Sequence, residues 1–532
     1  MARAAEAYVD RYTDANHELI WRDQWPGMDG SDDGYESYTS FPLLYVIGGA
    51  ERIHELAGRQ WDAVTKQFTR YGQVHNEYDA YYDWMHHGES SLYFYYFGMA
   101  DPTVAKDRDR ALRFAGMYMG EDAQADNWDA KLKMIKSPIN GSRGSRATMS
   151  AEDWVTHRPV LAEYLAPYED LDIYPKDAPP DHKLDWNDDA VFTKILAQMN
   201  ERMTPGDVPL NLTATSLITN AWLYTGDKKY ERWVLEYFDA WKRRTADNNG
   251  ITPDNVGPGG KIGEKMGGKW WGGYYGWRWP HGSFSIIEPL LIAASNAALM
   301  TGDLSHFDLP RSQLDMLWAL GRKENGKFVV PRKHGDKGWF QYVQPDSNFY
   351  IHLYYLTQAD EDRARLEKFE GREQWRTVGS FGKGGQFKAA PWHAFVEGEN
   401  EGYPQSVLSA TYDELSRRME VMRNDNGDPN EWDVHHWQDI NPVVCQGLAQ
   451  LTMGTPGNIY HGGLLHTRVR HFDPAKRRAG LPRDVAALVD RITPDSTRLT
   501  LVNTGVVESH EVLVQAGAFG EHQFTTVKHD GQ

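Results

Sequence analysis

Stretches almost free of charge alternate along the chain with stretches whose apolar residues follow a single helical face. Residues 208–226 contain no charged side chain, whereas Tyr230, Trp233, Tyr237 and Trp241 repeat at helical spacing among charged neighbours. A helix that is apolar all round is buried, and a helix with one apolar stripe covers it from outside. The pattern therefore predicts a hairpin made of a buried inner helix and an amphipathic outer helix.

The turn of this hairpin recurs in the sequence. Residues 220–227 read NAWLYTGD and residues 296–303 read NAALMTGD, with glycine where a helix commonly ends. Four more apolar stretches are expected to form inner helices in the same way, at residues 40–49, 91–98, 348–357 and 442–454. The N-terminal helix (residues 2–19) is the expected outer partner of the last of these stretches. Six such hairpins predict a mainly α protein folded as an (α/α)6 toroid. An open helical solenoid is the alternative, but it does not require inner helices without charge.

Two regions depart from the hairpin pattern. Residues 121–203 lie between the second and third hairpins, contain turn-rich parts, and are expected to pack across the ring as a cap. Short alternating runs at residues 498–504 and 511–520 are typical of strands. We therefore expect a toroid over residues 1–490, including the inserted segment 121–203. Residues 491–532 are expected to start a C-terminal β domain, truncated because its strands are too few to close a sandwich.

Composition and charge exclude several classes of protein. Hydrophobic residues make up 40% and charged residues 25% of the chain, as in globular proteins. A net charge of −18 argues against a nucleic-acid partner, and we expect no membrane span, which takes roughly 18–20 apolar residues. The single cysteine, Cys445, excludes an internal disulfide. The cytoplasm is the default location, and a secreted or periplasmic location is expected if a signal peptide was removed. No pattern in the sequence indicates the oligomeric state.

Residues 250–285 form the longest clean connector between hairpins, and glycine and aromatic residues dominate it. Aromatic faces beside hydrogen-bonding groups suit a sugar ring, and the 20 Trp and 28 Tyr of the chain point the same way. An aromatic plug that seals the helical core is the structural alternative. Because each hairpin turns tightly after its inner helix, the long connectors should share one face. The expected glycan-binding residues in these connectors are Trp270, Trp271, Tyr274, Trp277, Trp279, Trp84, Tyr82, Trp339 and Trp437.

Titratable residues gather in the same connectors. Histidine titrates near neutrality, and carboxylate pairs act as acid and base in glycosidases, although both residue types are also common structural elements. A tyrosine or histidine could instead remove the proton beside a uronate carboxylate that Arg278 neutralises. The candidate catalytic residues are His281, Tyr275, Arg278, His86, His87, Asp83, Asp254, His435, His436 and Asp439. No recognised metal-ligand spacing is present, so no metal site is assigned and no cofactor is required, while a divalent cation is left open.

The toroid, the motif WWGGYYGWRWPHG at residues 270–282 and the β-structure that follows resemble the toroid-containing polysaccharide lyases. Toroid glycoside hydrolases are the near alternative. The resemblance covers the architecture of residues 2–490 and implies β-elimination at a uronate-containing glycan, for which the basic stretch at residues 131–146 would supply a positive field. Hydrolysis by an Asp/Glu pair is the second hypothesis. A sugar epimerase and a non-catalytic glycan-binding protein are lesser ones.

Overall fold

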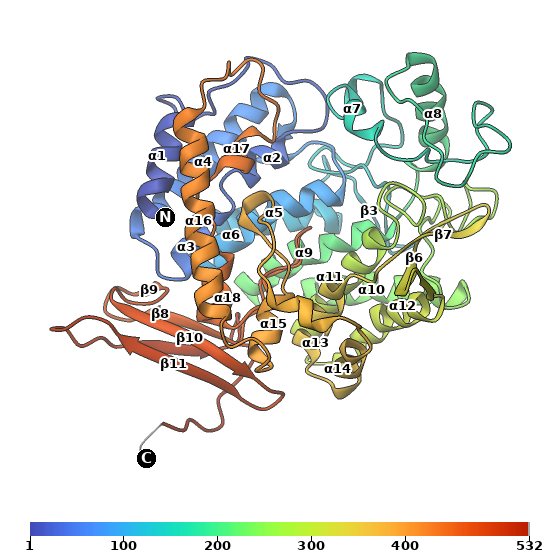
Figure 1. The fold of residues 1–532 in the computed structure, drawn as a ribbon. Coiled ribbons are helices and arrows are strands. Elements are labelled where there is room, and N and C mark those ends of the chain that lie inside the picture. The colour runs from blue at the N-terminus through green and yellow to red at the C-terminus, as the bar shows by residue number, and fades with distance from the viewer. Residues whose placement is uncertain (530–532) are drawn as a thin grey trace.

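The computed structural model describes residues 1–529 and consists mainly of helices arranged as an α/α toroid (Figure 1). Inner and outer helices alternate along the chain. The first hairpins pair α3 (Ser40–Val46) with α4 (Glu51–Tyr71), α5 (Trp84–Ala100) with α6 (Ala105–Met119), and α9 (Ala214–Thr225) with α10 (Lys228–Asp247). The next pair α11 (Phe284–Thr301) with α12 (Asp308–Ala319), and α13 (Ser347–Thr357) with α14 (Asp360–Glu367). The predicted fold class is confirmed.

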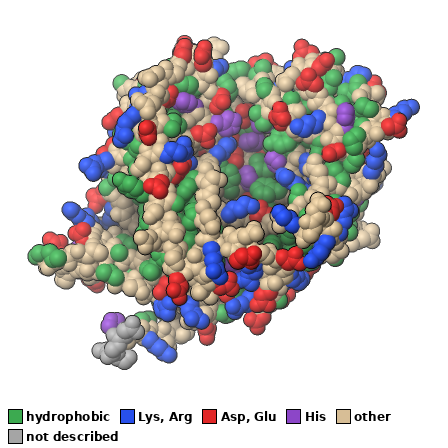
Figure 2. Space-filling view, in the orientation of Figure 1, with side chains coloured by type: hydrophobic (Ala, Val, Ile, Leu, Met, Phe, Trp, Pro, Cys, Tyr) green, Lys and Arg blue, Asp and Glu red, His purple; other side chains and the backbone are tan. Residues whose placement is uncertain are grey.

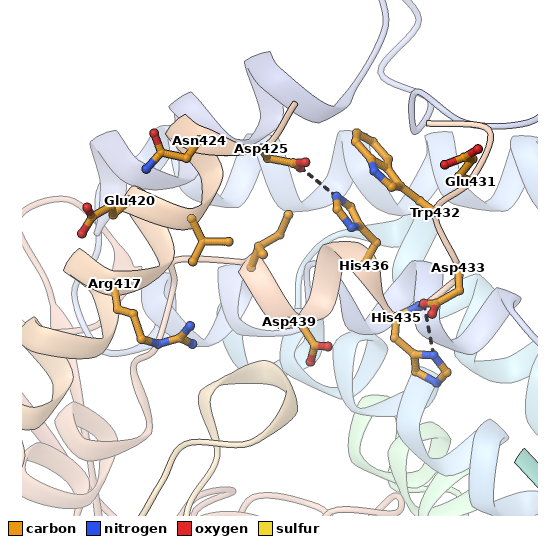
Figure 3. Close-up of a pocket in the computed structure, with 12 residues that line it drawn as sticks. Arg417, Glu420, Asn424, Asp425, Glu431, Trp432, Asp433, His435, His436 and Asp439 are labelled. Atoms are coloured by element: carbon orange, nitrogen blue, oxygen red, sulfur yellow. Dashed lines mark hydrogen bonds and ion pairs between the residues drawn. The ribbon is translucent and has the colours of Figure 1, made fainter. Parts of the chain in front are cut away.

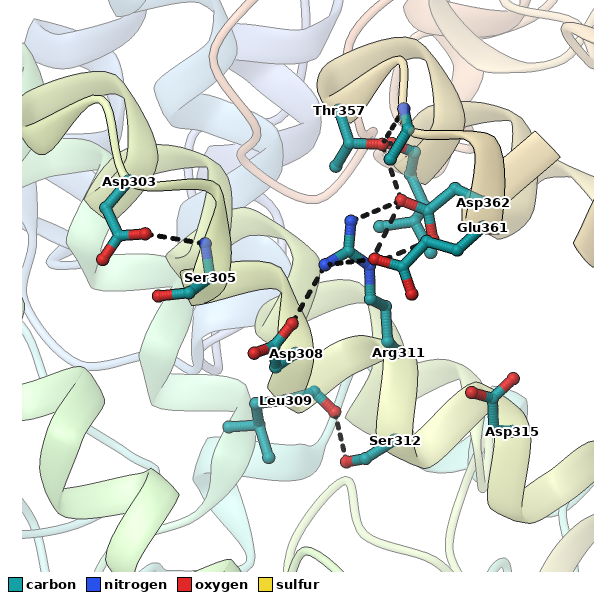
Figure 4. Close-up of polar contacts among 12 residues, drawn as sticks. Asp303, Ser305, Asp308, Leu309, Arg311, Ser312, Asp315, Thr357, Glu361 and Asp362 are labelled. Atoms are coloured by element: carbon teal, nitrogen blue, oxygen red, sulfur yellow. Dashed lines mark hydrogen bonds and ion pairs between the residues drawn. The ribbon is translucent and has the colours of Figure 1, made fainter. Parts of the chain in front are cut away.

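The repeated Gly-Asp turn performs two capping tasks. Gly226 and Gly302 end α9 and α11 with left-handed φ angles of 65° and 74°, which glycine adopts without strain. The next residue, Asp227 or Asp303, caps the following helix by accepting a backbone N–H bond from the residue two positions on (Figure 4). The sequence repeat therefore marks the sharp turn between an inner and an outer helix.

The inner helices form the core of the molecule. In α5 and α11 most side chains are buried, whereas α4 and α10 bury one face only. Helix α11 is long and apolar enough to cross a membrane by length and composition, which corrects the expectation that no such segment exists; 78% of it is buried inside the protein.

The last part of the ring contains a hairpin that the sequence pattern did not reveal. The buried helix α15 (Ala390–Val396) and the long α16 (Tyr403–Asn424) precede α17 (His436–Ile440) and the inner helix α18 (Gln446–Met453). Helix α1 (Ala2–Tyr12) lies beside α16 and α4 (Figure 1), where Glu6 pairs with Arg52 and Tyr8 donates a hydrogen bond to the Trp437 carbonyl. The N-terminal helix thus lies in the outer layer beside α4 and α16, and α16 is the outer helix that packs on the inner helix α18.

A buried ion pair fastens two outer helices to each other (Figure 4). Arg311 of α12 reaches Asp362 of α14 through Nη2 at 2.6 Å and Nε at 3.0 Å, and Thr357 donates to the same carboxylate at 2.6 Å. Asp308, also bound by Arg311, is 71% exposed. Arg311–Asp362 is therefore the buried contact between these helices, and Arg365 of α14 adds a partly exposed pair with Asp315 of α12.

The regions outside the hairpins lie on two sides of the ring. The inserted segment carries β3 (Trp128–Asp129), β4 (Met134–Ile135), α7 (Arg158–Leu161) and α8 (Asp189–Arg202). Its Glu169 accepts hydrogen bonds from Arg278 and from the Asp336 backbone, so it contacts the connectors. Connector hairpins are β1 (Val74–His75) with β2 (Tyr78–Asp79), and β5 (Arg322–Glu324) with β6 (Lys327–Gly335) and β7 (Gly338–Val343).

The C-terminal strands begin at Val469, earlier than the expected boundary at residue 491. Strands β8 (Val469–Asp473), β9 (Arg478–Ala479) and β12 (Leu513–Ala516) form one sheet in the order β12-β8-β9. Strands β10 (Val485–Ile492) and β11 (Thr497–Asn503) form an antiparallel pair, and β10 packs on α15 and α18. Residues 530–532 of the predicted β region lie outside the described residues.

Candidate functional site

A short acidic helix, α2 (Ser31–Glu36), lies at the entrance to the first inner helix. Asp32, Asp33 and Glu36 are only 1–3% exposed, although each carries a carboxyl group. Gly34 permits this burial, because a Cβ there would lie 2.6 Å from the Phe68 ring of α4. Burying ionised carboxylates is costly unless partners surround them, so their neighbours define the site.

Asp33 and Glu36 share one lysine. The Nζ of Lys383 lies 3.4 Å from Asp33 Oδ1 and 3.7 Å from Glu36 Oε2. Asp33 also accepts a hydrogen bond from Gln438, and Glu36 accepts one from Tyr460. Burial and the nearby charge of Glu89 raise the pKa of Glu36 to about 8. Glu36 is therefore a carboxyl group that stays protonated near neutral pH.

A second group of residues comes from the start of α5. Asp83 caps the helix by accepting the Met85 N–H and also bonds His86 Nδ1 at 2.9 Å. The His86 ring stacks on Tyr82, with centroids 3.9 Å apart. Burial lowers the pKa of His86, but the charges of Asp83 and Asp32 outweigh this effect and raise that pKa well above its usual value. On the other side, Asp29 accepts the Tyr82 hydroxyl at 2.8 Å and lies 3.4 Å from His157 Nδ1.

His461 joins carboxylates from two inner helices. Its Nδ1 lies 2.6 Å from Glu288 of α11, and its Nε2 lies 3.4 Å from Glu89 of α5. Although burial opposes it, Glu288 raises the pKa of His461. Glu89 also acts on Glu36 and on Asp32 through its charge, so the two groups of residues around α2 and α5 belong to one cluster.

Tyr275 and His281 face each other beside this cluster. Their ring centroids are 5.5 Å apart, and the Tyr275 ring lies 6.3 Å from that of His86. Tyr275 has a left-handed φ of 48°, a conformation that is uncommon outside glycine and clusters at functional sites. Burial and the positive neighbour His461 lower the pKa of His281 to about 3. His281 is therefore a neutral imidazole near neutral pH.

Histidine and acidic side chains gather around a hollow near the centre of the face shown in Figure 2. Small cavities border the cluster on two sides. One of about 10 Å³ is lined by Asp29, His86 and Tyr275 among others, and one of about 30 Å³ by Glu36, Tyr460 and residues of α18. The carboxyl groups of the cluster thus border space that a small group can enter.

Comparisons with known proteins add a family but no activity. A family model described as a domain of unknown function (DUF8034) matches residues 1–449. The chain belongs to the DUF8034 family. No curated protein matches it. Among solved structures, cellobiose 2-epimerase from Bacillus thermoamylovorans B4167 is similar, with 9% identity over 73% of this chain and 89% of that chain and a TM-score of 0.39. This likeness is too weak to carry an argument about function.

The structure of this DUF8034 protein brings part of the predicted catalytic set together. His86 and Tyr275 border one cavity, the His281 ring faces that of Tyr275, and Asp83 positions His86. His435 approaches Asp33, with 3.7 Å between Nε2 and Oδ1. Residues 72–91 were expected to form the connector before the second inner helix, but α5 already begins at Trp84. His86 and Glu89 therefore lie on a helix and not on a loop.

Other predicted catalytic residues have structural roles. Arg278 is buried against Glu169 at 2.9 Å and cannot neutralise a substrate in the cluster. His87 is fully buried between Asp79 and the Asn140 carbonyl. Asp254 accepts backbone N–H bonds from Gly272, Gly273 and Trp277 and thereby shapes the loop.

His436 and Asp439 line a different, open groove of about 970 Å³ beside α16 and α17 (Figure 3). His436 bonds Asp425 at 2.9 Å and stacks on Trp432, with ring centroids 3.9 Å apart. His435, from the same His-His pair, also lines this groove and pairs with Asp433 (Figure 3), and its Nε2 lies 3.7 Å from Asp33 of the acidic cluster.

Most of the predicted aromatic platforms are part of the core. Trp84, Trp277, Trp279, Trp437, Tyr274 and Tyr82 are at most 4% exposed. Trp270, Trp271 and Trp339 surround His334, with ring centroids 4.6–4.7 Å from it. The plug that seals the core is thus the better description of these rings, and the stacking role assigned to them is not supported by their burial.

Sequence reasoning missed several residues of the cluster. The sequence showed an acidic connector at residues 25–41, which contains Asp32, Asp33 and Glu36, but gave no reason to assign these residues a role. Glu89 was one of many carboxylates in the connectors. The signal for Glu288 was a single charge inside the apolar run of α11. Lys383 precedes the unrecognised helix α15, and His461 follows the predicted inner helix α18, but no hairpin register placed either residue near α2.

Proposed function

We propose that this DUF8034 protein is a carbohydrate-active enzyme that hydrolyses glycosidic bonds of a neutral glycan, with Glu36 as the general acid. The observation that supports this proposal best is a buried carboxyl group of raised pKa among other carboxylates. Glycosidases use two carboxyl groups whose environments push their pKa values apart, one as the acid and one as the base or nucleophile.

Glu89 is the proposed partner carboxylate. Its charge is the largest electrostatic influence that raises the pKa of Glu36, so the two groups act on one another. Nε2 of His461 lies 3.4 Å from Oε1 of Glu89 and holds this carboxylate in place. Glu36 would donate a proton to the leaving oxygen, while Glu89 would assist attack at the anomeric carbon. Tyr275 and His281, at the border of the cluster, would then orient the sugar.

The charge of the cluster favours a neutral glycan over a uronate. Asp33, Glu89 and Glu288 repel an anionic ring, while Lys383 and the nearby histidines oppose this repulsion. The basic stretch of the inserted segment does not offset this charge. Its Lys133, Lys136 and Arg146 pair with Glu236, Asp126 and Asp153.

One observation favours β-elimination as a second candidate. Tyr275 and His281 face each other, and the lowered pKa of His281 leaves its imidazole neutral and able to accept a proton. The group that would neutralise a uronate carboxylate is then Lys383, since Arg278 is bound to Glu169.

A panel of neutral and uronate-containing glycans distinguishes the two candidates. Reducing ends released from a neutral glycan, without the ultraviolet absorbance of an unsaturated uronate, support hydrolysis. That absorbance with a uronate glycan would replace hydrolysis by elimination. Isomerised sugar without cleavage would indicate an epimerase, and binding without turnover a glycan-binding protein.

A further inference from the structure

Three side chains bring potential metal ligands to one place beside the cluster. Asp29, Asp32 and His86 each offer one ligand atom, and these atoms lie within 4.8 Å of one another. The three residues are 6%, 1% and 9% exposed, so water does not screen them. They come from the first connector, α2 and α5, elements that the toroid holds in fixed positions.

Each of the three side chains is held through one atom and leaves the other free. Asp29 Oδ1 accepts the Tyr82 hydroxyl at 2.8 Å, Asp32 Oδ1 accepts the Gly30 N–H at 3.2 Å, and His86 Nδ1 bonds Asp83 at 2.9 Å. Within residues 1–529, the second carboxylate oxygen of Asp32 meets no hydrogen-bond donor, although the side chain is almost wholly buried. The same holds for His86 Nε2.

The hydrogen bond from His86 to Asp83 orients the imidazole for ligation. A histidine that binds a metal commonly donates its other N–H to a carboxylate, which fixes the ring and raises its basicity. Here Nδ1 is the nitrogen bound to the carboxylate, which leaves the lone pair on Nε2. The stacked Tyr82 ring restrains the same imidazole and also positions Asp29 through its hydroxyl.

A small cavity adjoins two of the three ligands. Asp29 and His86 line the cavity of about 10 Å³, and a volume of this size holds about one water-sized sphere. Metal–ligand bonds of about 2.0–2.2 Å require ligand atoms closer than those here, so the side chains must rotate inward. Two carboxylates would balance the charge of a divalent cation.

We propose that Asp29, Asp32 and His86 bind one divalent cation, of the type that accepts both imidazole and carboxylate ligands, Zn²⁺ or Mn²⁺. Mixed nitrogen and oxygen ligands favour these ions over Ca²⁺, which prefers oxygen alone. Asp83 and Tyr82 are positioning residues for the ligands. The site does not depend on the proposed hydrolysis, because cation binding is measured without substrate.

Titration calorimetry and metal analysis of the full chain test this site. Chain treated with EDTA and then given ZnCl₂ or MnCl₂ should bind about one ion at a strong site and melt at a higher temperature. Asp32→Asn and His86→Gln should each weaken that binding at least tenfold. His436→Gln is the matched control, since this histidine also bonds one aspartate but lies in the open groove; it should bind the cation as the wild type does.

Melting temperatures without metal separate loss of the site from loss of the fold. Asp32→Asn removes a charge that neighbouring Asp33 and Asp29 repel, so the metal-free variant should melt no lower than the wild type. Asp83→Asn keeps a helix-capping side chain and should weaken cation binding less than His86→Gln does. The proposal is overturned if the wild type binds neither cation, or if Asp32→Asn, His86→Gln and the control bind them equally.

Discussion

The Nδ1 atom of His461 lies 2.6 Å from Oε2 of Glu288, and this contact joins the loop after α18 to the inner helix α11. The Glu288 side chain is 6% and the His461 side chain 14% exposed, and Glu89 approaches the other ring nitrogen. An imidazole between two carboxylates is held in its charged form, so the stability that this contact gives to the protein depends on pH.

Glu288→Gln should lower the free energy of unfolding by about 3 kcal/mol at mildly acidic pH, because it removes one partner of a buried pair. The folded-state pKa of His461 is raised. Its contribution to stability is therefore complete below the unfolded pKa and is lost as pH rises through the folded value. Denaturant unfolding at about pH 5.5 and about pH 9 should show the larger deficit at the lower pH. An equal deficit at both would contradict a charged His461, and Glu163→Gln, an exposed glutamate, is the control.

Asp362→Ala should destabilise the protein by about 3–5 kcal/mol, since it leaves the buried Arg311 guanidinium without its main partner. Asp308→Ala removes an exposed partner of the same arginine and should cost less than about 1 kcal/mol. Chemical denaturation of both variants provides the comparison. Similar losses in the two variants would mean that the buried pair is not what fastens α12 to α14.

Asp254→Ala should lower stability by about 3 kcal/mol or more, because three backbone N–H donors of the loop lose their acceptor. Activity per folded molecule should fall together with loop order, as seen in the near-ultraviolet circular dichroism of the tryptophans. A variant with the wild-type melting temperature but no turnover would restore Asp254 as a catalytic residue.

The fold could be predicted because the burial of helices produces a regular pattern of apolar and charged residues along the chain. An inner helix such as α9 lacks charge along its length, and the glycine after it ends the helix at a defined residue. Helix α15 was not recognised, because seven residues are too few to display such a period, whereas α18 lies within the predicted stretch 442–454. Lys383 and His461 lie in the segments beside these helices, and no hairpin pattern placed them in the site.

The candidate site could be predicted only in outline. The face of the molecule followed from the hairpin geometry, but the direction of each side chain did not. In the motif at residues 270–282, Tyr275 and His281 turn toward the cluster while Trp277 and Arg278 turn into the core. Aromatic composition alone does not separate a sugar platform from a packed ring, since both bury apolar surface.

Tyr275→Phe and His281→Ala should each lower kcat/KM at least tenfold, about 1.4 kcal/mol in transition-state stabilisation, with little change in melting temperature. Tyr275 borders the cavity and His281 faces its ring, and neither side chain forms a contact that fastens the helices. Trp277→Phe is the structural counterpart, because it removes the buried indole hydrogen bond to the Thr252 carbonyl and should lower stability instead. Full turnover in both cavity variants would remove this pair from the site.

The pH–rate profile of the wild type and of Glu36→Gln on a cleaved neutral glycan tests the central claim most directly. If Glu36 is the acid, wild-type kcat/KM should fall as pH rises through about 8, because the carboxyl group must be protonated to donate. Glu36→Gln should lose on the order of a hundredfold or more in rate. It should be at least as stable as the wild type above neutral pH, where ionising the buried carboxyl group costs folding energy. Turnover by Glu36→Gln at the wild-type rate, with the same high-pH decline, would contradict the assignment.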